Sequence, residues 1–231
     1  IRLTYYSSEC EVDFCGHGTI ACMYHLIKTT PALLAQSEIP IITHQKGQLT
    51  VYNKILLQDT VFITAPEPVY LGTRLRGGTV AQALGLPAHA VSAAYPIDVI
   101  DAGLRTLIVP LADPATEISV FPDEQQLKSF CVENDLDIIL IFSMVPRQRG
   151  YIAHTRVFAP KFGYLEDPAT GSGNSAFGNY MLKNSLWDGS DCRIEQGGRD
   201  RVFNAVHLSA EDGKVRFGGS ATVRIDGVYY A

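Results

Sequence analysis

Two short glycine-rich stretches hold the residues of this chain that are best suited to chemistry. The first reads Cys-Gly-His-Gly-Thr-Ile-Ala over residues 15–21, and the second reads Thr-Gly-Ser-Gly-Asn-Ser-Ala over residues 170–176. Each runs into an apolar stretch typical of a helix. A glycine-rich turn at a helix start presents backbone N–H groups at the positive end of the helix dipole, which suits a carboxylate or a phosphate. The pair therefore predicts two similar halves that face each other across a cleft for a small anion.

The expected donors of this anion site are backbone amides of small residues. In the two stretches they are Gly16, Gly18, Gly171, Ser172 and Gly173. Gly219, inside the Gly-Gly-Ser run of residues 218–220, is expected to add a third donor loop. The alternative is that these glycines only permit tight turns. Because two matched stretches begin two helices, we favour the binding interpretation.

Two titratable side chains belong to the same stretches. His17 can transfer a proton near pH 7, although by itself it is more readily read as a histidine that hydrogen-bonds its own loop. Asp167 comes just before the second stretch, where a carboxylate can either brace the helix start or contact a substrate amine or hydroxyl. Glu166 is expected to support the loop.

Hydrophobic periodicity and turn residues predict the elements that must position these residues. We expect helices over 18–28, 79–84, 123–134 and 174–186. We expect strands over 2–6, 38–44, 48–53, 61–65, 104–111, 138–142, 151–158, 206–209, 214–217 and 221–225. Lys46-Gly47 and Asp212-Gly213 are hairpin signals, and Asp226-Gly227 is a turn signal. The pattern predicts an α+β fold of two pseudo-symmetric lobes, 1–92 and 93–222, each with strands around one central helix, the last strand (about 223–231) returning to the first lobe.

Composition narrows the class of protein. The chain has 231 residues, 46% hydrophobic and 19% charged, with a formal net charge of −5, which argues against a nucleic-acid partner. No apolar run reaches the roughly 18 residues of a membrane span. The five cysteines form no CxxC pair, and the histidines are scattered, so we expect neither a metal site nor a zinc ribbon, and a reduced, cytoplasmic location.

Several motifs resemble those of the PhzF-like isomerases of phenazine biosynthesis. Residues 11–19 are similar to the family pattern E-x-x-x-C-G-H-[AG]-T. Residues 156–160 followed by Glu-Asp-Pro-Ala-Thr-Gly-Ser at 166–172 resemble its second signature. Gln196-Gly197 and Gly218-Gly219 match its QG and late glycine motifs. The resemblance spans almost the whole chain and implies the diaminopimelate-epimerase fold, in which each lobe is a curved sheet or barrel around its helix and the active site lies between the lobes.

The resemblance implies an enzyme that needs no cofactor and moves a proton on a small carboxylic acid. It implies that His17 and Asp167 are catalytic and that the glycine-rich stretches bind the substrate carboxylate. Related epimerases and racemases use two cysteines as acid and base. Here Cys15 is one of these positions, but Thr170 holds the other, and a hydroxyl cannot replace a thiol at neutral pH, so racemisation is disfavoured and Cys15 is expected to be a small buried residue. A non-catalytic small-molecule-binding protein of the same fold is the other alternative.

One family feature has no counterpart in this sequence. Proteins that it resembles carry their general acid/base as a glutamate in an N-x-S-E-T segment well upstream of the Cys-Gly-His motif, whereas Cys15 has only fourteen residues before it. Glu9 and Glu11 lie in the wrong place to replace this glutamate. Since the chain begins with Ile1, we expect it to start inside a longer protein, with the glutamate on a missing N-terminal segment or a second chain. Homodimers are common among such proteins, so a second copy is a further candidate partner.

Overall fold

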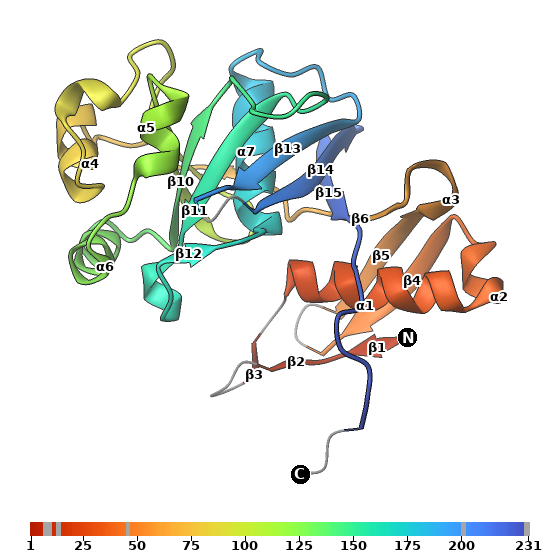
Figure 1. The fold of residues 1–231 in the computed structure, drawn as a ribbon. Coiled ribbons are helices and arrows are strands. Elements are labelled where there is room, and N and C mark those ends of the chain that lie inside the picture. The colour runs from red at the N-terminus through yellow and green to blue at the C-terminus, as the bar shows by residue number, and fades with distance from the viewer. Residues whose placement is uncertain (7–10, 13–14, 45–46, 200–201, 229–231) are drawn as a thin grey trace. The chain divides into compact units, whose positions relative to one another are not determined.

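The computed structural model describes all residues except 7–10, 13–14, 45–46, 200–201 and 229–231 (Figure 1). Contacts divide the chain into two compact units: unit 1 is Ile1–Ile63 with Gly218–Ala231, and unit 2 is Thr64–Phe217. The sequence predicts the boundary between the two lobes at residues 92 and 93. Residues 64–92 fall within unit 2 because β7 (Val69–Tyr70) pairs with β8 (Asp98–Asp101), and α4 (Gly77–Ala83) contacts α6 (Glu124–Glu133).

Unit 1 is built on strands in the order β1-β4-β5-β6. Their bounds are β1 (Arg2–Leu3), β4 (Glu38–Thr43), β5 (Gly47–Lys54) and β6 (Thr60–Thr64). β1 runs parallel to β4, whereas β4, β5 and β6 pair antiparallel. A separate ribbon pairs β2 (Tyr5–Tyr6) with β3 (Glu11–Val12). The helices are α1 (Gly16–Thr29), α2 (Pro31–Leu34) and α3 (Ile55–Gln58).

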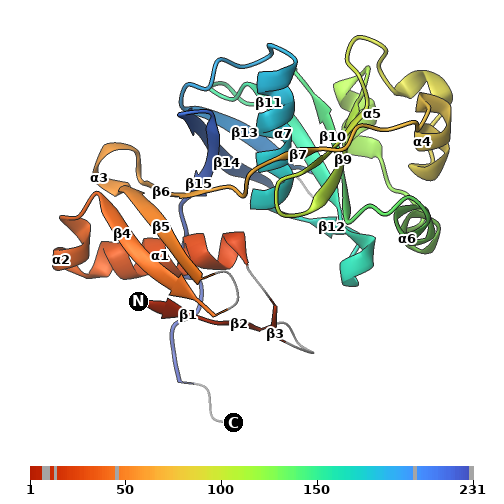
Figure 2. The same ribbon diagram turned by 180° about the vertical axis from the view of Figure 1, so that it is seen from behind.

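Helix α1 forms because its apolar side chains recur at helical spacing. Its buried residues are Thr19, Ile20, Met23, Tyr24 and Ile27, which lie on one face. In β4, exposed and buried residues alternate, as expected of a strand with one face in a core. Both ribbon views show α1 lying over β4 and β5 (Figures 1 and 2). The sheet of unit 1 therefore buries its apolar face beneath this helix.

Unit 2 contains a longer run of strands, in the order β15-β14-β13-β11-β10-β9-β8-β7, with β12 on β11. The remaining bounds are β9 (Arg105–Pro110), β10 (Ile138–Ser143), β11 (Ala153–Phe158), β12 (Glu166–Asp167), β13 (Cys192–Gly197), β14 (Phe203–Glu211) and β15 (Lys214–Gly219), whose last two residues belong to unit 1. The pairs β9/β10 and β11/β13 are parallel. Its other helices are α5 (Pro114–Ser119) and α7 (Gly171–Lys183), with short 3-10 turns at Ala88–Ala90 and Pro160–Phe162.

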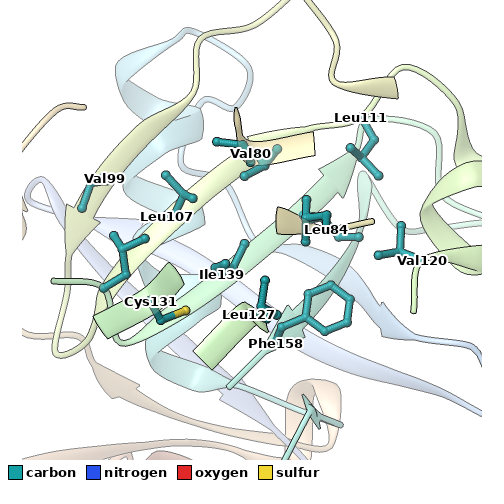
Figure 3. Close-up of a cluster of buried hydrophobic side chains, with 13 residues drawn as sticks. Val80, Leu84, Val99, Leu107, Leu111, Val120, Leu127, Cys131, Ile139 and Phe158 are labelled. Carbon is teal, nitrogen blue, oxygen red and sulfur yellow. The ribbon is translucent and has the colours of Figure 1, made fainter. Parts of the chain in front are cut away.

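Both faces of the unit 2 sheet are covered. Alternate residues of β9 and β10 join a buried cluster with Leu127 and Cys131 of α6 (Figure 3). On the other face Phe142 packs against Phe177 of α7, with ring centroids 4.7 Å apart. Because these strands are buried on both sides, they read as continuous apolar runs in the sequence. Helix α7 is consequently the central helix of unit 2, buried at every position from Gly173 to Met181.

Most expected elements are confirmed, and the departures are local. Helix α7 starts at Gly171 rather than at 174, so the glycines form its first turn. The hairpin signal Asp212-Gly213 is confirmed, with φ of 51° and 75°. The strand over 221–225 is wrong: no strand is assigned over 220–228, where Ile225 is 93% exposed, and residues 229–231 and Lys46 lie outside the described residues. Within the described ranges, no helix has the length and apolar character needed to cross a membrane.

Candidate functional site

The first group of predicted site residues lies at the start of α1 in unit 1. Cys15 is the N-cap residue, and its side chain makes no capping hydrogen bond. The backbone N–H and the hydroxyl of Thr19 both donate to the Cys15 carbonyl, at 2.9 and 2.8 Å. The Tyr5 hydroxyl lies 2.7 Å from Thr19 Oγ1 and ties the β2 ribbon to this turn. The turn is thus fixed from inside the unit, and the Cys15 side chain does not serve as its cap.

His17 and Cys15 meet at this helix start. His17 is exposed, and its Nε2 lies 3.6 Å from Cys15 Sγ. Cys15 is only half-buried, so the expected burial of this side chain is incomplete. A Cβ added to Gly18 would lie 2.9 Å from Cys15 Sγ, so a larger residue here would require the Cys15 side chain to turn. The arrangement places an imidazole and a thiol within the first turn of α1.

Gly219 does not lie in a loop. It is buried at the end of β15, and a Cβ on its neighbour Gly218 would come within 2.4 Å of the Val61 carbonyl oxygen. Gly218 is therefore required by close approach of two backbones. A role for Gly219 as a donor to a ligand stays a prediction.

The second group of predicted site residues lies at the start of α7 in unit 2. Thr170 is the N-cap residue, but its hydroxyl donates to Asp167 Oδ2 at 2.6 Å instead of capping the helix. Asp167 and Thr170 are 8% and 5% exposed. Behind them the fully buried Gln196 of β13 contacts both residues. The structure therefore brings Asp167, Gly171, Ser172 and Gly173 together at one helix start.

The glycines of this helix start are needed for close packing. A Cβ on Gly171 would lie 2.2 Å from Phe217 Cε2, and one on Gly173 would lie 3.1 Å from Ile138 Cδ1. Ser172 is half-buried. The first turn of α7 thus sits directly on core side chains, and its amides keep a fixed direction.

Side-chain caps are used elsewhere in unit 2. Asp113 accepts from the Thr116 amide at 2.7 Å at the start of α5, and Asp123 accepts from the Gln126 amide at 2.8 Å at the start of α6. The N-cap residues of α1 and α7 make no such bond, and neither do those of α2, α3 and α4. What distinguishes the starts of α1 and α7 is the glycine-rich first turn, which suits an external anion.

A buried charge network supports the Asp167 segment. Arg156 is fully buried and binds Glu166 through two parallel contacts. Nearby, His154 donates from Nε2 to the Gly197 carbonyl at 2.8 Å, and its Nδ1 lies 3.0 Å from Glu117 Oε1. Burial raises the pKa of Glu117, and although burial alone would lower the pKa of His154, its contact with Glu117 raises it. The expected role of Glu166 in supporting the loop agrees with its contacts to Arg156. The His154 and Glu117 contact was not predicted, because these residues lie in a buried strand and a short helix without a local pattern that marks them.

Beside Asp167 the surface of unit 2 is hollowed. The hollow has a volume of about 380 Å³ and is lined by Glu166, Pro168, Gly197, Gly198, Arg199, Val202 and Asn204. Asn204 donates to the Pro168 carbonyl at 2.8 Å and so holds the segment that carries Asp167. Among the residues that the structure describes, no three histidine, cysteine or acidic side chains are arranged to hold a metal ion.

Comparisons with known proteins agree on a family. The family model described as "Phenazine biosynthesis-like protein" (PhzC-PhzF) matches residues 1–227. Antisense-enhancing sequence 1 of Schizosaccharomyces pombe is 26% identical over 78% of this chain and 60% of its own length. The uncharacterized isomerase YddE of Escherichia coli O157:H7 is 25% identical over 96% of this chain and 77% of its own length. The chain thus spans less than two thirds of the first relative and about three quarters of the second.

Solved structures share the fold. The crystal structure of a Bacillus anthracis phenazine biosynthesis protein of the PhzF family superposes with a TM-score of 0.83, at 21% identity over 95% of this chain and 77% of that one. At this identity the likeness concerns the fold alone, and it agrees with the α+β architecture described above. Because the family model covers nearly the entire sequence, the chain belongs to the PhzC-PhzF family of phenazine biosynthesis-like proteins.

Proposed function

We propose that this protein is a cofactor-independent isomerase that moves a proton on a small carboxylic acid. The observation that carries the proposal is the start of α7, where the buried Asp167 lies beside a helix whose N-cap side chain bonds to Asp167 instead of capping the helix. A carboxylate acceptor next to open backbone amides can hold an acid and handle its proton at one place. Family membership and relatives named isomerases support the same reaction class.

In this proposal the backbone amides bind and the titratable side chains transfer the proton. In unit 2 the first-turn amides of α7, at Gly171, Ser172 and Gly173, bind the substrate carboxylate. In unit 1 the proposed donors to the substrate are Gly16, Gly18 and Gly219. His17, exposed and next to Cys15, and Asp167 assist proton transfer. The principal acid/base is a glutamate outside this sequence, as the family resemblance implies.

A two-thiol racemase is less well supported by the site. Such a mechanism needs a second thiol at the start of α7, where Thr170 stands with its hydroxyl hydrogen-bonded to Asp167. A threonine hydroxyl is far too weak an acid to alternate with Cys15 near neutral pH. One-proton isomerisation is therefore the reaction that these side chains fit.

The test is deuterium incorporation in D₂O. The protein, together with the segment or second chain that supplies the glutamate, is incubated with a panel of small unsaturated and amino-bearing carboxylic acids, and label is followed by NMR and mass spectrometry. We expect incorporation into at least one acid, and a loss of at least a hundredfold in His17→Ala and in Asp167→Asn. His25→Ala, an exposed histidine on the same helix, is the matched control and should exchange at the wild-type rate. Binding of an acid without exchange would instead indicate a non-catalytic binding protein.

A further inference from the structure

Gln196 occupies the centre of the hydrogen bonds around Asp167. Its Oε1 accepts from the Thr170 backbone N–H at 3.0 Å and from Asn174 Nδ2 at 2.7 Å. Its Nε2 donates to the Asp167 carbonyl at 2.7 Å and to Thr170 Oγ1 at 3.2 Å. The side chain is fully buried, and all four contacts go to the segment that begins α7. Nothing in this arrangement contributes to the apolar core.

Two backbone groups fix the orientation of the Gln196 side-chain amide. The Thr170 N–H can only donate, so the atom facing it must be the Gln196 oxygen. The Asp167 carbonyl can only accept, so the atom facing it must be the Gln196 nitrogen. The second N–H of that nitrogen then points at Thr170 Oγ1, which must accept from it. The hydroxyl proton of Thr170 is left for Asp167 Oδ2, 2.6 Å away.

The Thr170 hydroxyl does not make the hydrogen bond that a threonine at the N-cap of a helix usually makes. Threonine is among the residues favoured at the N-cap because its oxygen accepts from the second or third amide of the helix. Thr170 makes no such bond, whereas Asp113 and Asp123 do at the starts of α5 and α6. Thr30, the N-cap residue of the short helix α2, also makes no capping bond. At Thr170 the hydroxyl is occupied by two side chains, because it accepts from Gln196 and donates to Asp167.

We propose that Gln196 is a positioning residue: through Thr170 it fixes one oxygen of Asp167 and keeps the first-turn amides of α7 open for the substrate carboxylate. Among the described residues, Thr170 is the one side chain that hydrogen-bonds the Asp167 carboxylate, so its direction sets that of the carboxylate. The inference rests on the proposed function, in which Asp167 and these amides act on the substrate.

The first test needs no activity. In Gln196→Met the Thr170 hydroxyl is released and turns to cap α7. Hydrogen exchange by NMR should then show at least tenfold slower exchange of the Ser172 or Gly173 amide. Gln196→Met combined with Thr170→Val removes the hydroxyl and should abolish that protection. Asn204→Ala removes another hydrogen bond to the same segment and is the matched control, which should leave these amides unchanged. Unchanged amides in a folded Gln196→Met would overturn the proposal.

The second test uses the exchange reaction. Gln196→Glu has nearly the same size, keeps both acceptor contacts and loses at least one of the two donor contacts, so it is a second variant beside Gln196→Met. We expect the rate at saturating acid to fall at least tenfold in Gln196→Glu and in Thr170→Val, with Thr170→Ser close to wild type. Effects of the Gln196 and Thr170 changes should not add, because both act through one hydroxyl. Full rates in Gln196→Glu would overturn the proposal.

The experiments distinguish failure of the proposed isomerase function from failure of the proposed role of Gln196. Absence of deuterium incorporation in the wild-type protein, with the amide changes as expected, would remove the proposed function and leave the control of Thr170 by Gln196 intact. Incorporation with unchanged amides and unchanged rates in the variants would leave the isomerase and remove Gln196 from it.

Discussion

Arg156 Nε and Nη2 each lie 2.8 Å from an oxygen of Glu166, so that guanidinium and carboxylate form a two-pronged pair. Arg156 also donates to the carbonyls of Glu117, Ile118 and Val120. The arginine is fully buried in β11, and Glu166 directly precedes Asp167. The pair therefore joins β11, β12 and the end of α5 underneath the Asp167 segment.

Removing this arginine should destabilise the protein strongly. Arg156→Met leaves three carbonyls and a carboxylate without their donor, and breaking a buried ion pair from one side typically costs about 3–5 kcal/mol. Lys161→Met is the matched control, because the Lys161–Asp137 pair is partly exposed and such pairs are worth about 0–1 kcal/mol. Urea unfolding measures both. A loss below about 1 kcal/mol in Arg156→Met would show that the buried pair does not hold the segment.

A glycine-to-alanine change at the start of α7 should lower the stability of the protein, whereas the same change in α4 should raise it. Gly171→Ala brings a Cβ within 2.2 Å of Phe217, and overpacking of this kind costs about 1–3 kcal/mol. Gly78→Ala in α4 meets only Ala88, at 3.9 Å, and should stabilise by about 0.4–1 kcal/mol because the unfolded chain loses freedom. Thermal unfolding of both variants checks the signs. Equal changes in stability in the two variants would contradict the close packing of Gly171 against Phe217.

The sequence was informative wherever a single local pattern decides the structure. Asp123 followed by apolar residues at helical spacing marks α6, and Asp212-Gly213 marks the turn between β14 and β15, because a cap and a positive-φ turn depend on neighbouring residues alone. The segment 221–225 has the composition of a strand, but no paired strand covers it, so it stays exposed. Pairing partners are a property of the fold that one segment cannot encode.

The candidate site shows the same limit. Sequence motifs predict roles for His17, Asp167 and the glycines, but β13 was missed because its inner residues include Glu195 and Gln196. Both are fully buried. Gln196 is hydrogen-bonded to the start of α7, and one oxygen of Glu195 accepts from the Arg147 backbone N–H. A polar residue is stable in a core only when its partners are supplied from elsewhere in the chain. The QG motif was the one available signal of Gln196, and it could not say what Gln196 contacts.

Thiol reactivity should separate the cysteines by burial. Burial raises the pKa of Cys131 to about 11 and, with the charges of Asp191 and Asp188, that of Cys192 to about 12. At pH 8 only about one thiol in a thousand is ionised when the pKa is 11. Cys22 is exposed. Iodoacetamide labelling followed by peptide mass spectrometry should therefore modify Cys22 at least a hundredfold faster than Cys131, and comparable rates would contradict the buried position of Cys131 in the core of unit 2.

The buried pair of His154 and Glu117 should make the protein less stable as the pH rises above neutral. The pKa of each group is raised in the folded state, Glu117 by burial and His154 because its contact with Glu117 outweighs burial; Glu195 and Arg156 also act on the pair. The folded protein therefore binds more protons than the unfolded chain. The contribution of His154 is complete below pH 6.5 and that of Glu117 below pH 4.5, the ordinary pKa values of the two groups, and each is lost as the pH rises through the folded value. Burial lowers the pKa of His207, so this group makes the protein more stable as the pH rises toward 6.5. Its effect therefore lies below the range in which the His154 contribution is lost.

Urea unfolding between pH 6.5 and 9 tests this directly. The free energy of unfolding should fall by up to about 1.4 kcal/mol per pH unit for one proton. Glu117→Gln removes the charge that raises the pKa of His154 and should flatten the slope in that range, while lowering stability at pH 6.5. Glu133→Gln makes the same chemical change at an exposed position of α6 and should leave the slope as in the wild type. A slope that is equally steep in Glu117→Gln would mean that groups other than this pair release the protons.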